Sequence, residues 1–122
     1  MAGKLVHFEI AASDDSRAMD FYKLVFGWEF QDSGMPGVSY NLTQPGGDPG
    51  GAVYAMEGVD PSILVYFDTD DIEGSIAKVR NAGGQAEDKQ PIPGVGWFSH
   101  CTDTEGNQFG LFLSDESVAN QS

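Results

Sequence analysis

The sequence has little cysteine, little positive charge and no long hydrophobic run. Its single cysteine, Cys101, excludes an intrachain disulfide and fits a reducing compartment. Lysine and arginine number 6 against 19 aspartates and glutamates, which gives a net charge of −13. Such a field repels nucleic-acid phosphates and anionic lipid headgroups, so we expect neither nucleic acid nor a membrane as a partner. No segment approaches the roughly 20 apolar residues of a membrane-spanning helix, and we expect a cytoplasmic protein.

The sequence does have the length of one domain and many glycines. A chain of 122 residues is typical of a single domain. Its 16 glycines indicate many tight turns between short strands. We therefore predict a single domain over residues 1–122, built from one module at about 4–57 and a second at about 62–114.

Hydrophobic periodicity predicts the same order of elements in both modules. The first module is predicted to hold a strand, a helix and three strands, at 4–10, 16–26, 28–31, 38–42 and 52–56. The second module repeats this order at 63–68, 72–82, 85–90, 96–102 and 108–113. An aspartate pair precedes each helix, and we interpret Asp14-Asp15 and Asp70-Asp71 as helix caps rather than as an acidic active site. The predicted fold class is α+β, with two βαβββ modules in one chain.

Motifs at both ends of this pattern are similar to those of one known family. They are Val-His-Phe-Glu-Ile at 6–10, Asp-Asp-Ser-Arg-Ala-Met-Asp-Phe-Tyr at 14–22, Val-Phe-Gly-Trp at 25–28 and Asp-Thr-Glu-Gly-Asn-Gln-Phe-Gly-Leu-Phe at 103–112. In this order they resemble the vicinal oxygen chelate superfamily, which includes glyoxalase I, bleomycin-resistance proteins and extradiol dioxygenases. The resemblance implies paired modules whose sheets curl around a cleft.

The resemblance also implies where a divalent metal would be held. The family's usual ligands are a His on the first strand and a Glu on the fourth strand of each module. His7 matches the first position, but Leu64 and Gly110 stand where the second His and the final Glu are expected. The first module's fourth strand, 52–56, contains no acidic residue. Stable sites use three or four protein ligands, so we predict no metal cofactor. The alternative is a divalent ion held by His7 and His100.

His7 and Glu9 are the candidate catalytic residues. Side chains alternate along a strand, so these two lie on the same face. A neighbouring carboxylate can tune an imidazole for acid–base chemistry. The alternative interpretation is a pair of polar residues that are solvated or hydrogen-bonded without a catalytic role.

Aromatic residues on the predicted strands are the candidate ligand-binding residues. Together with a histidine, they are Tyr40, Tyr54, Tyr66, Phe98 and His100. Aromatic walls with few polar groups suit a planar or apolar small molecule, although the same residues would also suit a core or a subunit interface. Trp28 and Phe30, which follow the first helix, are predicted as core residues, and Cys101 as a buried small residue rather than a nucleophile.

Three functions are compatible with these features. We expect a small-molecule binding or resistance-type protein of this superfamily, without the usual metal site and with a cationic ligand favoured by the acidic chain. The alternative is a metal-dependent or His/Glu-dependent enzyme, which would be a glyoxalase-like lyase, an isomerase or a dioxygenase. A third possibility is an interaction module. Exposed sheet edges favour association, so we expect a homodimer.

Overall fold

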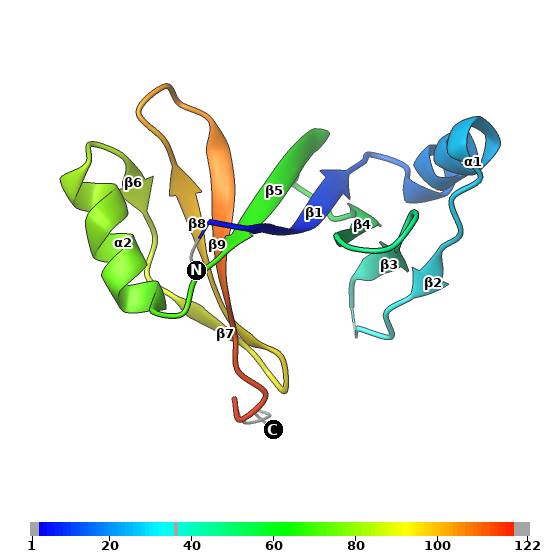
Figure 1. The fold of residues 1–122 in the computed structure, drawn as a ribbon. Coiled ribbons are helices and arrows are strands. Elements are labelled where there is room, and N and C mark those ends of the chain that lie inside the picture. Colours follow the sequence, from blue (N-terminus) through cyan, green and yellow to red (C-terminus); the bar gives the residue numbers. More distant parts are fainter. Residues whose placement is uncertain (1–2, 36, 119–122) are drawn as a thin grey trace. The chain divides into compact units, whose positions relative to one another are not determined.

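The computed structural model describes residues 3–35 and 37–118, in which strands and helices follow one another in a repeated order (Figure 1). The elements are β1 (Leu5–Ala11), α1 (Asp15–Phe26), β2 (Gln31–Asp32), β3 (Ser39–Thr43), β4 (Gly50–Ala55), β5 (Ser62–Asp68), α2 (Ile72–Asn81), β6 (Gln85–Ala86), β7 (Gln90–Ile92), β8 (Gly96–Thr102) and β9 (Gln108–Ser114). They fall into two compact units. The first unit comprises residues 6–64, and the second comprises the described residues among 1–5 and 65–122.

The first unit has a four-stranded sheet in the order β2-β3-β4-β1. β1 and β4 run parallel, with Glu9 opposite Ala52, whereas β3 and β4 run antiparallel, with Tyr40 opposite Tyr54. Residues opposite each other on neighbouring strands share a face. One face therefore carries His7, Glu9, Tyr40 and Tyr54, and the alternating residues of the same strands lie on the other.

α1 begins and ends with local capping chemistry. The carboxylate of Asp14 accepts a hydrogen bond from the Arg17 amide at 3.0 Å, and Gly27 adopts the left-handed conformation that ends the helix, with φ of 74°. Asp15 accepts hydrogen bonds from Ser39 and Asn41 of β3. These contacts hold α1 to the sheet face opposite the one that carries His7 and Glu9.

The second unit contains the larger hydrophobic core. Its sheet has the order β5-β9-β8-β6, with β7 also paired to β8. α2 contacts β6, β8 and β9. The buried cluster consists of Ile72, Ile76, Cys101 and Leu111, which place one face of this sheet against α2. The Asp71 carboxylate caps α2 by accepting a hydrogen bond from the Gly74 amide at 3.0 Å, which confirms the capping interpretation.

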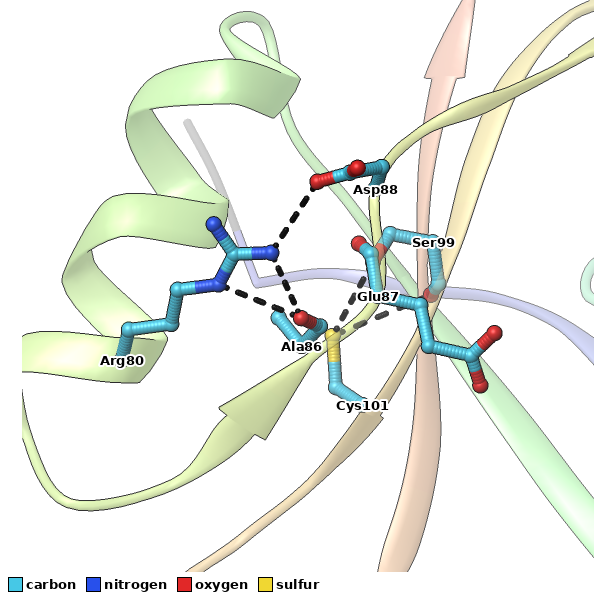
Figure 2. Close-up of polar contacts among 6 residues, drawn as sticks. All are labelled: Arg80, Ala86, Glu87, Asp88, Ser99 and Cys101. Carbon is cyan, nitrogen blue, oxygen red and sulfur yellow. Dashed lines mark hydrogen bonds and ion pairs between the residues drawn. The ribbon is translucent and has the colours of Figure 1, made fainter.

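Side-chain hydrogen bonds also join the strands of the second unit where the main chain is irregular (Figure 2). Arg80 reaches from α2 to the Ala86 carbonyl at 2.8 Å and to the Asp88 carboxylate at 3.2 Å. The Ser99 hydroxyl donates to the Glu87 carbonyl at 2.7 Å. Three residues, 87–89, stand opposite two residues of β8, because the register shifts by one between β6 and β7. This is a β-bulge, and it breaks the strand predicted at 85–90 into two short ones.

The predicted fold class is confirmed, and one more strand begins later than predicted. Both units have the order strand, helix and further strands, and in both the first strand pairs in parallel with the last. The strand predicted at 28–31 begins later, at Gln31, because the preceding Trp28 stacks on Tyr22 of α1 with ring centroids 5.0 Å apart. Within the described residues, neither helix is long and apolar enough to cross a membrane.

Candidate functional site

The centre of the candidate site is a hydrogen-bonded group of three side chains in the first unit. The Tyr40 hydroxyl lies 2.8 Å from His7 Nε2 and donates to Glu9 Oε2 at 2.7 Å. β1 supplies His7 and Glu9, and β3 supplies Tyr40. The predicted shared face of His7 and Glu9 is thus observed, and one phenol connects the imidazole to the carboxylate.

The neighbouring strand residues leave room for these side chains. Gly50 and Ala52 of β4 stand opposite His7 and Glu9, so β4 presents only small groups at these two positions of the face. Beyond them, the rings of Tyr40 and Tyr54 lie 5.8 Å apart.

Burial controls the ionisation of this group. Burial lowers the pKa of His7 below its usual value, and the negative charge of Glu9 opposes that shift only in part. Burial raises the pKa of Tyr54, and the Glu9 charge raises it further. Near neutral pH, His7 is therefore a neutral imidazole beside a carboxylate, which is the state needed to accept a hydrogen bond or a proton.

The other predicted ligand-binding residues form a second cluster, in the second unit. The Tyr66 hydroxyl lies 3.3 Å from His100 Nε2, and the Phe98 ring lies 5.2 Å from the His100 ring. Strand register places all three on the sheet face opposite the α2 core. The prediction thus selected residues that gather in two places, one in each unit, and their roles in ligand binding stay predictions.

The residues of the family's usual metal positions do not fit a divalent ion. A Cβ at Gly110 would lie 2.2 Å from the Tyr66 ring, so the space for a glutamate there is already filled by Tyr66. The Nε2 atom of His7 is engaged with Tyr40. In the part of the chain that the structure describes, no three His, Cys, Asp or Glu side chains gather as a metal site. His7 and His100 lie in different units.

An open cleft of about 1100 Å³ lies within the first unit, beside His7. Its lining is formed by His7 with Phe26, Gly27, Trp28, Glu29, Phe30, Gln31, Leu42, Thr43, Gln44, Pro45, Gly46, Gly50 and Gly51. The prediction of Trp28 and Phe30 as core residues is wrong, since both are half-buried and line this cleft. Trp28 and Phe30 are two residues apart and follow the end of the helix. In an extended segment, this spacing places both side chains on the same side.

Cys101 is buried, as predicted, and is not placed for chemistry. Its side chain is 4% exposed and lies 3.5 Å from the Ser99 hydroxyl (Figure 2). Burial raises the pKa of the thiol, so the reactive thiolate is disfavoured.

Comparison with known proteins identifies the family. Residues 4–111 match the family described as the glyoxalase/bleomycin resistance protein/dioxygenase superfamily. The chain belongs to this superfamily. This confirms the resemblance drawn from the motifs, and it extends over almost the whole chain.

Two curated proteins are similar to the chain in sequence. The chain is 29% identical over 120 residues to the putative glyoxylase CFP32 of Mycobacterium tuberculosis (strain CDC 1551 / Oshkosh), an alignment that covers 90% of this chain and 45% of that protein. It is 33% identical over 118 residues to a glyoxylase-like domain-containing protein of Didymella fabae, covering 89% and 92%. The chain thus spans about half the length of the curated mycobacterial relatives it matches.

A solved structure supports the fold. The crystal structure of methylmalonyl-CoA epimerase from Mycobacterium tuberculosis aligns with a TM-score of 0.66 at 16% sequence identity, covering 92% of this chain and 88% of that chain. At this identity the likeness extends to the fold and not to the reaction.

Proposed function

We propose that the chain binds a small organic molecule in the cleft of the first unit, without a divalent metal. The observation that carries the proposal is the position of His7, which lines the cleft and is hydrogen-bonded through Tyr40 to Glu9. Clefts with aromatic walls and a few fixed polar groups are typical of small-molecule sites. The filled space above Gly110 supports the metal-free mode of binding.

The lining favours a planar cation. Phe26, Trp28 and Phe30 supply aromatic surface, and Glu29 supplies a negative charge at the same cleft. Cations are attracted to aromatic faces as well as to carboxylates. The net charge of −13 adds a long-range field that concentrates cations near the protein. A resistance-type protein that sequesters such a compound is the function that these features support best.

Fluorescence titration tests this proposal, because the chain has only two tryptophans. The planar cation 9-aminoacridine is titrated against wild type, W28F and W97F, with and without EDTA. Trp28 lines the cleft and Trp97 packs against the core of the second unit. Binding is expected to weaken in W28F, to persist in W97F and to be unaffected by EDTA. Binding that requires an added divalent ion would contradict the proposal, as would equal affinity for W28F and wild type.

A second candidate function is acid–base catalysis by His7 and Glu9, as in a lyase or isomerase. The neutral His7 beside a carboxylate favours it. In that case His7→Ala would abolish turnover of the substrate while circular dichroism remained that of wild type. Full activity of the alanine variant would exclude this role.

We also propose that two copies of the chain associate. α1 has no buried residue, and its apolar side chains Phe21, Leu24, Val25 and Phe26 are 57%, 88%, 51% and 62% exposed. Exposed apolar surface of this kind is typical of interfaces. Sedimentation velocity of wild type is expected to show a dimer, and L24E is expected to shift it toward the monomer. A monomeric wild type at high micromolar concentration would refute the proposal.

A further inference from the structure

We propose that Tyr40 is a positioning residue that fixes the tautomer of His7, with the proton on Nε2 and the lone pair on Nδ1. This deepens the proposed function and rests on it, because it states how His7 meets its ligand. Any group that contacts Nδ1 of the neutral ring must then donate a hydrogen bond. A ligand that meets His7 through Nδ1 must therefore carry an N–H or O–H donor.

The tautomer follows from the single hydroxyl hydrogen of the Tyr40 phenol. A tyrosine hydroxyl has a single hydrogen to donate, and a carboxylate can only accept. Tyr40 donates that hydrogen to Glu9 at 2.7 Å. Its oxygen also lies 2.8 Å from His7 Nε2. With its only hydrogen committed to Glu9, the Tyr40 oxygen must accept the second bond, so Nε2 carries the hydrogen.

The sheet holds Tyr40 in this orientation. Its backbone pairs with that of Tyr54 in the β3–β4 register, and the two rings lie 5.8 Å apart. On its other side, the Tyr40 ring lies at 22° to the His7 ring, with centroids 6.4 Å apart. β1 carries both partners of the hydroxyl two residues apart, so one strand sets both hydrogen-bond distances.

Tyr40 acts through His7 rather than at the cleft itself. Among the described residues, the cleft lining includes His7 and does not include Tyr40. In a neutral imidazole, the choice of tautomer decides whether the ring nitrogen opposite Nε2 accepts or donates.

Nitrogen-15 NMR of untagged protein tests the proposal directly. The chain has two histidines, so H100Q assigns the His7 ring signals. In ligand-free wild type at pH 7.5, we expect the protonated-nitrogen shift at Nε2 and the unprotonated shift at Nδ1. In Y40F, which keeps the ring and removes the hydroxyl, the two shifts should move toward each other as the tautomers mix. Y54F, which removes a hydroxyl from the adjacent ring, is the matched control and should keep the wild-type pattern.

A second variant covers the case in which Y40F folds poorly. In E9Q the side-chain amide offers both a donor and an acceptor to Tyr40, so the direction of its hydroxyl is no longer fixed. E9Q should therefore also move the two His7 nitrogen shifts toward each other. A wild-type ring with its proton on Nδ1 would overturn the proposal, and so would variants that leave the shifts unchanged.

A binding measurement separates this proposal from the proposed function. The affinity of 9-aminoacridine, which carries N–H donors, should fall about twofold in Y40F if the two tautomers become equally populated, because only one of them accepts at Nδ1. The affinity of its N,N-dimethylated analogue, whose exocyclic nitrogen carries no N–H donor, should change less. If wild type binds neither probe, the proposed function fails, while the NMR result still decides the role of Tyr40.

Discussion

At the scale of single residues, His7 is a half-buried base whose environment opposes its protonation. Burial lowers its pKa in the folded protein, whereas an unfolded histidine titrates near 6.5. As the pH falls below about 6.5, the unfolded chain therefore binds more protons at this position than the folded chain does. Folding stability contributed by the neutral ring is present above this pH and is lost as the pH falls toward the lower, folded pKa.

This linkage predicts that His7→Gln flattens the dependence of stability on pH. Urea unfolding of wild type should show a lower free energy of unfolding at pH 5.5 than at pH 7.5. H7Q should lose less over the same interval, because glutamine takes up no proton. H100Q, which replaces the exposed histidine of the second unit, is the matched control for the loss of one histidine. Equal losses in H7Q and wild type would show that another group carries the dependence.

Strand alternation was sufficient to predict that His7 and Glu9 share a face, because the relation is local. The contact of both with Tyr40 was not predictable, since it depends on the register of β3 against β4 and of β4 against β1. The same holds for Trp28 and Phe30. Their aromatic character predicted burial, but their place beside a cleft depends on the main chain between α1 and β2.

At the scale of elements, each helix begins at one aspartate of a pair. Asp71 caps α2 through the Gly74 amide, and Asp70 precedes it. We predict that D71A lowers the free energy of unfolding by about 1 kcal/mol, the usual effect of losing an N-cap. D70A should change it by less than about 0.5 kcal/mol. Chemical denaturation of both variants measures the difference, and equal effects would argue against a specific cap at Asp71.

The contact between β5 and β9 gives a second prediction at this scale. Gly110 lies beneath the buried Tyr66 ring, and a Cβ there would lie 2.2 Å from it. G110A should therefore lower the free energy of unfolding by about 1–3 kcal/mol through overpacking. In a Y66V background the same substitution should be less harmful, because the ring is absent. A double-mutant cycle by urea denaturation measures this coupling, and additive effects would contradict it.

Periodicity predicted most elements to within a few residues, including β8 over residues 96–102 without error. It could not predict the bulge at 87–89. That irregularity depends on the Ser99 hydroxyl of β8, which donates a hydrogen bond to the Glu87 carbonyl. Periodicity also could not predict the hydrogen bonds of Asp15 with Ser39 and Asn41, since they join segments that are distant in the sequence.

At the scale of the whole molecule, the net charge of −13 affects the stability of the folded chain. Mutual repulsion of like charges destabilises compact states, and salt screens it. Between about 0.01 and 0.1 M salt, the screening length falls from about 30 to about 10 Å. We therefore predict that the urea midpoint rises over this range, equally in NaCl and KCl. A midpoint that falls with salt would show that attractive charge pairs dominate instead.

The family could be predicted from the sequence because its motifs lie at both ends of the repeat and in the right order. Its usual chemistry could not be transferred with the fold. Leu64 replaces a possible ligand in the sequence, but only the structure shows that Tyr66 fills the space at Gly110. At Gly110, a side chain from a neighbouring strand thus occupies the volume that the family's usual glutamate would need.

The parallel pairing of first and last strands also determines how the chain is made. β1 can pair with β4, and β5 with β9, only after the later strand of each pair has been synthesised. The antiparallel pairs alone do not complete either sheet. On the ribosome, each unit must therefore be synthesised to its final strand before its first and last strands can pair. A stop within β9 would leave β5 without its parallel partner β9 and β8 without its antiparallel partner.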